Sequence, residues 1–340
     1  MVEALNAASH LGVCATWFST IDSERIDSFI DRADVLVLCR ARYNAVVDQI
    51  LSRAKIRNIP VLFDVDDLIF DLDYVPLIVD ALDQNVETDI TWDNWFGAVS
   101  RLQTTLRRCD GAITTNQYLV DRISAVVPNV TPRVVPNFLN RAQQERSCAI
   151  FDAKWRSEFK RDYQIHIGYF SGTPTHNHDF SVVLPAIAVL MDEDPRIVLR
   201  VVGHVRHAGV LARHRDRIET FPLQDFVNLQ GLIGEVEINV APLQNNIFTN
   251  CKSELKYFEA AVVGTLTIAS PTYTFANSIV DGQNGYLACA HEWESKLDVA
   301  INLLGTPKKY AEIAKCAHEQ AISNYGWDQL ANKIVSALFG

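Results

Sequence analysis

Cysteine is scarce in this chain, and its arrangement suggests no structural use. The seven cysteines are odd in number, widely scattered and never in a C-x-x-C pair. A zinc site or a disulfide framework is therefore not indicated. A reducing, cytoplasmic compartment is the simplest interpretation.

Long apolar runs and an excess of positive charge are also absent. No stretch approaches the ~20 apolar residues that cross a bilayer, and no basic segment followed by an apolar run opens the chain. Peripheral contact with the inner face of the cell membrane stays compatible with this. Lys and Arg number 31 against 41 Asp and Glu, a net charge of −10. Nucleic-acid binders present a basic face, so no nucleic-acid partner is expected.

What is present is an alternation of β-rich runs with helical patterns, over 340 residues. Helical spacing occurs at 41–58 and 95–109, and a polar stretch at 140–163 divides the chain. Apolar strands separated by helices predict an α/β fold of parallel sheets covered on both faces. The length predicts two domains. The predicted strands are 12–20, 33–40, 59–67, 111–116 and 132–137, then 165–172, 196–203, 225–231, 237–243 and 265–270.

The pattern therefore predicts two Rossmann-like domains, 1–140 and 141–325, joined near Pro136–Asn137. The chain opens with VEALNAASHLG, which is typical of the first helix of a βα unit and lacks the strand before it. In a doubly wound sheet that strand is central and its loop faces the ligand. We therefore expect a segment of a longer, multidomain chain. The alternative is that another part of the chain replaces the strand.

The stretch VLFDVDDLIFD (61–71) places four aspartates after an apolar run. It resembles the D-x-D-G-T motif of haloacid dehalogenase-like phosphatases, in which Asp64 would be the nucleophile and Asp66 the general acid–base. Asp67 and Leu68 replace the Gly and Thr, however, and two predicted strands precede the motif, which that family places on its first strand. Asp64-Val65-Asp66 also fits the D-x-D of metal-dependent glycosyltransferases, although a second α/β domain is not expected of that fold.

A third interpretation comes from NNIFTNCKSELKYFEAAVVGTLTIAS (245–270), where a helix is predicted to begin near Lys252 or Ser253. Lys252, Lys256 and Glu259 then lie at i, i+4 and i+7 on one face. Two ammonium groups near a helix N-terminus favour a diphosphate without a metal. A carboxylate one turn further can accept hydrogen bonds from a ribose diol.

The segment EAAVVGTLTIAS (259–270) resembles the nucleotide-binding signature of glycosyltransferase family 4, in which the glutamate holds the donor ribose. Further pieces follow in the family's order: the hinge-like VVPN, the donor-phosphate loop, the D-G-x-N-G-x-L element and the final helix that crosses back to the first domain. They lie at 134–137, 167–180, 279–288 and 325–335. The resemblance implies the GT-B fold, two facing Rossmann-like domains with an interdomain cleft, and a retaining mechanism.

The sequence departs from the family pattern at two places. Cys251 stands where many members have a first glutamate, so Lys252, Ser253 and Lys256 are expected to supply those contacts. The frequent cleft histidine is absent, and Asp66 and Asp67 stand in its place. The predicted catalytic set is Asp66, Asp67, Lys256 and Lys252, and the predicted donor-binding set is Gly172, Thr173, His176, Gly203, Asn250, Ser253 and Glu259.

The predicted function is metal-independent, retaining transfer of a hexosyl or deoxyhexosyl group from a nucleotide-diphosphate sugar to a glycan or lipid-linked glycan. The branch that the sequence resembles makes bacterial surface polysaccharides. No cofactor is expected, because the nucleotide sugar is the substrate. The alternatives are a catalytically silent GT-B-like module of a larger synthase and, with less support, the phosphatase.

Overall fold

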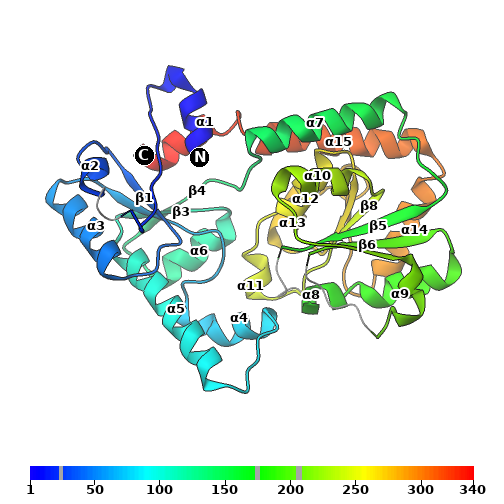
Figure 1. The fold of residues 1–340 in the computed structure, drawn as a ribbon, viewed down its shortest axis with the longest axis horizontal. Coiled ribbons are helices and arrows are strands. Elements are labelled where there is room, and N and C mark those ends of the chain that lie inside the picture. The colour runs from blue at the N-terminus through cyan, green and yellow to red at the C-terminus, as the bar shows by residue number, and fades with distance from the viewer. Residues whose placement is uncertain (23–25, 173–176, 204–208) are drawn as a thin grey trace.

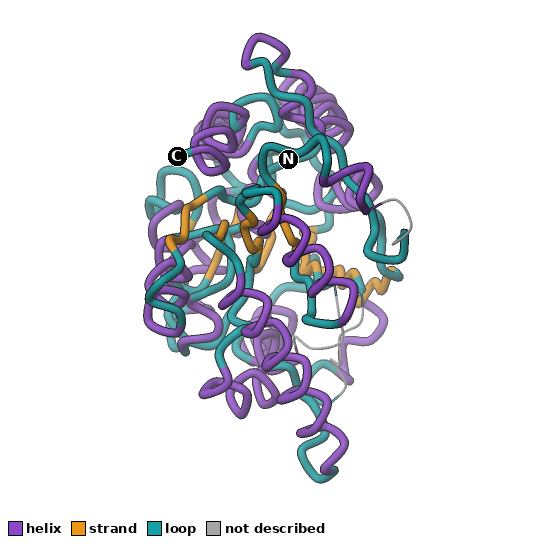
Figure 2. The backbone as a smooth tube through the Cα atoms, turned by 90° about the vertical axis from the view of Figure 1, so that its left-hand side faces the viewer, coloured by secondary structure: helices purple, strands orange, loops and turns teal. Residues whose placement is uncertain are grey.

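The computed structural model describes residues 1–22, 26–172, 177–203 and 209–340. Two parallel sheets form two lobes, connected by the segment 135–140 and by the chain between α15 and α16 (Figure 1). In the orthogonal view the strands form a central layer with helices on both sides (Figure 2). The predicted α/β class with two parallel sheets is confirmed. No helix in the described ranges combines the length and apolarity needed to cross a membrane.

The first domain has four strands in the order β1-β2-β3-β4. Its core packs apolar strand residues such as Phe63 against helix residues such as Ile50 and Leu106. Its elements are α1 (Val2–Ala7), η1 (Ser9–Leu11), α2 (Ile26–Ile30), β1 (Leu36–Cys39), α3 (Ala45–Ile56), β2 (Val61–Asp64), η3 (Leu72–Tyr74), α4 (Val75–Ala81), α5 (Asp89–Arg108), β3 (Gly111–Thr114), α6 (Gln117–Val126) and β4 (Thr131–Val134).

The second domain has six strands in the order β10-β9-β8-β5-β6-β7. The chain therefore reverses its direction of sheet growth between β5 and β8. Its elements are α7 (Arg141–Arg156), β5 (Ile165–Phe170), α8 (Asn177–Ser181), α9 (Leu184–Glu193), β6 (Ile197–Val202), η5 (Ala212–Arg217), β7 (Ile218–Phe221), α10 (Phe226–Gly234), β8 (Ile238–Ala241), α11 (Ile247–Asn250), α12 (Leu255–Ala261), β9 (Leu266–Ala269), α13 (Tyr273–Ser278), β10 (Tyr286–Leu287), α14 (Trp293–Leu303) and α15 (Pro307–Tyr325).

The last helix, α16 (Ala331–Phe339), leaves the second domain and packs on the first. Its residues Ile334 and Leu338 share a cluster with Leu62 of β2 and Ile113 of β3. The Arg133 guanidinium donates to the Ala337 carbonyl at 2.8 Å. The apolar face of this helix thus covers the first sheet, and the chain crosses between the domains twice.

Two predicted strands are wrong. Residues 226–231 lie in α10, and Asp225 is its N-cap, with a carboxylate that accepts hydrogen bonds from the Val227 and Asn228 amides. The two edge strands of the second sheet, β7 and β10, were not predicted from the sequence. Residues 12–20 join neither sheet. Val13 and Ala15 are partly buried, but the Ala15 amide and carbonyl both bond to the Asn6 side chain.

Candidate functional site

The reversal between β5 and β8 places a crevice at the carboxyl ends of the second domain's strands, where ligands bind in doubly wound folds. The first domain faces this edge. The Asn116 amide, after β3, donates to the Cys251 carbonyl at 2.9 Å, and the Asn137 amide donates to Ser253 Oγ at 3.0 Å. Phe248 and Cys251 are buried against the first domain's core.

Two glycines lie in the loops after β5 and β6. Gly203 has a φ of +94°, and a Cβ there would lie 1.9 Å from the Ser171 carbonyl oxygen, so no side chain fits. A Cβ on Gly172 would meet no atom of the described residues within 4 Å, so this position is open among them. The predicted contacts Thr173 and His176 fall outside the described residues.

Lys256 lies in the first turn of α12. Its Nζ is buried 4.5 Å from the centre of the Tyr169 ring and has no hydrogen-bond partner among the described residues. Burial lowers the pKa of this ammonium to about 8, with Asp179 and Glu259 opposing that shift. A buried, unsatisfied ammonium is costly, so this is a prepared position for an anion.

Glu259 lies one turn along the same helix, half-buried. Its Oε1 accepts a 3.0 Å hydrogen bond from Gln143 Nε2. Burial raises the pKa of the carboxyl group to about 7, against the lowering effects of the Gln143 amide and the Lys256 charge. Glu259 and Lys256 therefore lie together, as predicted, with a glutamine that sequence reasoning missed.

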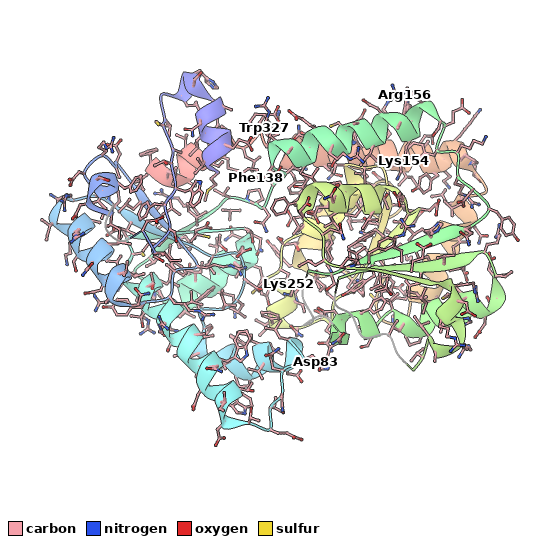
Figure 3. The ribbon with its side chains drawn as sticks, in the orientation of Figure 1. Asp83, Phe138, Lys154, Arg156, Lys252 and Trp327 are labelled. Atoms are coloured by element: carbon pink, nitrogen blue, oxygen red, sulfur yellow. The ribbon has the colours of Figure 1, made fainter. Side chains whose placement is uncertain are left out.

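Lys252 is not part of this helix. The predicted start near Lys252 or Ser253 is wrong, because α12 begins at Leu255 with Glu254 as its N-cap and Lys252 follows the short α11. The i, i+4 relation to Lys256 therefore fails. Lys252 still faces the interdomain side, since its Nζ lies 3.6 Å from Asp67 Oδ2 of the first domain (Figure 3).

Asn250 and Ser253 have structural partners. Asn250 Oδ1 accepts from the Tyr273 amide at 2.8 Å, and its Nδ2 donates to the Asn246 carbonyl at 2.7 Å. These bonds tie α11 to the start of α13. Ser253 Oγ is the acceptor for Asn137 at the domain connection. Their predicted role in donor binding stays a prediction.

The three aspartates at the end of β2 and just beyond it have different surroundings. Asp66 forms an ion pair with Arg40, and Asp67 pairs with Lys252 across the domains. Asp64 has no such cation partner among the described residues. Burial and the neighbouring Asp66 charge raise its pKa to about 6, although the Cys39 thiol donates to it and lowers the pKa. Asp64 therefore titrates closer to neutrality than an ordinary aspartate does.

Asp64 also lines a cavity of about 290 Å³ at the domain connection. Thr115 and Asn137 add polar groups to its wall, and Phe138 and Trp327 add aromatic rings. The last two lie close together between the lobes in Figure 3. Its volume is at the lower end of small-molecule pockets, which favours one small ring.

A second polar contact joins the domains beside α8. Asn177 Nδ2 donates to Asp83 Oδ2 at 2.9 Å, and His178 Nε2 lies 3.4 Å from Asp83 Oδ1. Figure 3 shows Asp83 of the first domain and Lys252 of the second in the region between the two lobes. In the described ranges no group of three or more His, Cys, Asp or Glu side chains could hold a metal ion.

Sequence reasoning missed Gln143, Tyr169, Arg40 and Asp83 as neighbours of the site. A signal existed for Gln143 alone, since Asn140 and Gln143 form a capping box at the start of α7. The others meet the site through sheet topology and domain packing, which no local pattern contains.

No family model matches the sequence, and no curated protein matches it. Solved structures do match in fold. HepE of Anabaena, in complex with UDP and glucose, is 12% identical, with a TM-score of 0.62 over 92% of this chain and 80% of that one. Sucrose-phosphate synthase from Thermosynechococcus elongatus is 15% identical, with a TM-score of 0.60 over 93% and 76%. A glycosyltransferase from Rickettsia africae is 14% identical, with 0.59 over 95% and 83%. The chain therefore has the GT-B fold.

Proposed function

We propose that this protein is a retaining glycosyltransferase that moves a sugar from a nucleoside diphosphate to a glycan hydroxyl without a metal ion. The observation that carries the proposal is the buried Lys256 ammonium, which has no partner among the described residues and lies at the switch point of a GT-B fold. UDP is the first nucleotide to test, because HepE of similar fold is solved with UDP and UDP-glucose.

The donor's diphosphate would lie against Lys256, with Lys252 and the backbone of Gly172 near it. These groups stabilise the negative charge that grows on the leaving phosphate oxygen in the transition state. Glu259, in its ionised form, accepts hydrogen bonds from the ribose hydroxyls. The cost of burying these charges is offset only when the donor is bound, which favours binding at this position.

In the transfer step the bond between the anomeric carbon and the phosphate oxygen breaks, and a bond to the acceptor oxygen forms on the same face. The acceptor proton passes to the departing phosphate oxygen, so no protein nucleophile is required. Contacts between the domains, such as Lys252 with Asp67, exclude water from this chemistry and limit donor hydrolysis.

The acceptor would place a sugar ring in the cavity beside Asp64. The carboxylate accepts a hydrogen bond from a sugar hydroxyl, and the rings of Phe138 and Trp327 offer apolar faces to its carbon atoms. Asp66 and Asp67 then act indirectly, because their carboxylates are paired with Arg40 and Lys252. This assignment moves the main acceptor contact from Asp66 and Asp67 to Asp64.

The test is calorimetric titration with UDP, GDP and dTDP, first with EDTA and then with Mg²⁺. Micromolar binding of one nucleotide in EDTA, lost in Glu259→Ala and kept in the surface control Lys308→Met, supports the proposal. Binding that needs Mg²⁺ contradicts metal independence. No binding of any nucleotide contradicts the proposed function.

Binding alone does not separate an enzyme from a silent nucleotide-binding module. Slow release of free sugar from the bound donor, detected by NMR of its anomeric proton, separates them. A transferase hydrolyses its donor slowly without acceptor, and the first-formed sugar keeps the donor's anomeric configuration. A protein that binds donor and never cleaves it, with or without glycan acceptors, is a module.

A further inference from the structure

Gln143 occupies an unusual position for a glutamine in a first helical turn. Its side chain is only 4% exposed, although it belongs to a helix that begins at Arg141. Its Oε1 accepts from the Asn140 amide at 3.4 Å, while the Asn140 side chain accepts from the Gln143 amide at 2.9 Å. The bond from the Asn140 backbone amide to Oε1 orients the glutamine side chain and leaves its NH₂ group free to donate elsewhere.

That NH₂ group donates to Glu259 Oε1 at 3.0 Å, from a residue 116 positions earlier in the sequence. Because a glutamine amide donates but carries no charge, it orients the carboxylate without neutralising it. Among the described residues, the positive charge of Lys256 also lowers the pKa of Glu259 and so favours its carboxylate form. Removing the amide would leave a buried carboxylate with one hydrogen bond fewer.

The glutamine also connects Glu259 to the junction between the domains. α7 follows the connecting segment directly, and within that segment the Leu139 amide donates to the Tyr325 carbonyl at 2.9 Å. Tyr325 is the last residue of α15, where the chain begins its return to the first domain. The two segments that connect the domains are therefore hydrogen-bonded to each other about one helical turn before Gln143.

We propose that Gln143 is a positioning residue: it holds the Glu259 carboxylate ionised and oriented for a ribose diol, and it fixes that carboxylate to the domain junction. The proposal rests on the proposed nucleotide-sugar site. Gln143 touches neither donor nor acceptor in this scheme, and it acts through Glu259 alone.

The experiment compares UDP with 2′-deoxy-UDP in the full chain, by calorimetry. Gln143→Met removes the amide at nearly constant volume. Gln143→Glu keeps an acceptor for the Asn140 amide but sets a second carboxyl group against Glu259. Asn140→Ala is the matched control, because it weakens the same helix cap and leaves the Gln143–Glu259 bond in place. Thermal unfolding checks that each variant is folded.

We expect the wild type to prefer UDP over 2′-deoxy-UDP. Each Gln143 variant weakens UDP binding about 10-fold, the size of one hydrogen bond to a charged group, and most of the preference for the 2′-hydroxyl disappears. Asn140→Ala keeps both the affinity and the preference. With UDP-glucose, whose diphosphate does not titrate near neutrality, the pH at which binding strengthens moves upward in Gln143→Glu.

Variants that bind UDP as the wild type does overturn the inference and leave the proposed function intact. Equal weakening of UDP and 2′-deoxy-UDP also overturns it, since a merely structural role has that signature. A wild type that binds no nucleotide overturns the proposed function, and this inference with it.

Discussion

Two lysines of the second domain have buried ammonium groups at opposite ends of its strands, and they differ in whether the ammonium group has a hydrogen-bond acceptor. Lys154 Nζ contacts Thr265 just before β9 begins, and Lys256 Nζ lies over the ring of Tyr169 near the carboxyl end of β5. Burial lowers the pKa of Lys154 to about 7 and that of Lys256 to about 8. Lys154 Nζ donates to Thr265 Oγ1 at 2.9 Å, and its distance to the Gly264 carbonyl is 3.4 Å.

Lys256, in contrast, has no acceptor among the described residues. Burial and a shifted pKa are therefore common to both lysines and do not identify function by themselves. The difference is that the fold completes the surroundings of Lys154 and leaves those of Lys256 incomplete. An incomplete polar site at a switch point is what a ligand can complete.

The largest effect is expected for Lys256→Met. Loss of the charge should weaken UDP binding about 100-fold, because charge-assisted bonds to the diphosphate are lost. The free protein should become more stable by about 1 kcal/mol at pH 7. The folded pKa lies below the usual value of a lysine, so the wild type loses stability as the pH falls from 10.5 to about 8, and the loss is complete below that. Calorimetry and thermal unfolding measure both effects.

The matched control for that variant is Lys308→Met, an exposed lysine at the start of α15. It should change neither affinity nor stability appreciably. If Lys256→Met lowers stability and leaves UDP binding unchanged, Lys256 is a structural lysine like Lys154, and the comparison between them fails.

The next largest effect is expected from pH. Ionised Glu259 and protonated Lys256 are both required, so UDP-glucose affinity should rise through about pH 7 and fall above about pH 8. Each limb should approach a tenfold change per pH unit, because one proton is involved. Titrations between pH 5.5 and 9.5, as round limits for this scan, measure the profile. Glu259→Gln should remove the rising limb only. A flat profile contradicts this pair of roles.

A smaller effect is expected at the domain interface. Asp67→Asn removes the carboxylate that lies 3.6 Å from Lys252, so the lysine becomes fully available to the diphosphate. UDP affinity should rise about threefold, the scale of a partly exposed ion pair. Asp66→Asn should have no such effect, because Asp66 pairs with Arg40 instead. Equal responses in the two variants would show that Lys252 does not face the donor.

The smallest effect on binding is expected for Lys154→Met, with UDP affinity unchanged within about twofold because the two lysines act at distant sites. Its signature is in stability. The lowered pKa of Lys154 means that wild-type stability falls as the pH falls from 10.5 to about 7 and levels off below that. Urea unfolding at pH 6 and pH 8, round values on either side of that pKa, should show a smaller difference in the variant. A loss of UDP affinity would remove the contrast with Lys256.

The α/β alternation was readable from the sequence, because buried parallel strands such as VLVL (35–38) and VLF (61–63) are continuously apolar and lie between helical patterns. The sequence also placed Lys256 and Glu259 on one helical face, since α12 carries both. It failed at residues 225–231, where one capping aspartate decides between strand and helix. It failed again at Lys252, where a break of four residues separates α11 from α12.

Local patterns therefore determined the class of the fold and one helix of the candidate site, because hydrophobic period and helix spacing are properties of neighbouring residues. Only the tertiary structure decided which charged groups are satisfied. Gln143 reaches Glu259 across 116 residues, and Asp67 meets Lys252 from the other domain. Whether a buried charge has a partner depends on the packing of distant elements, and no spacing along the chain specifies that.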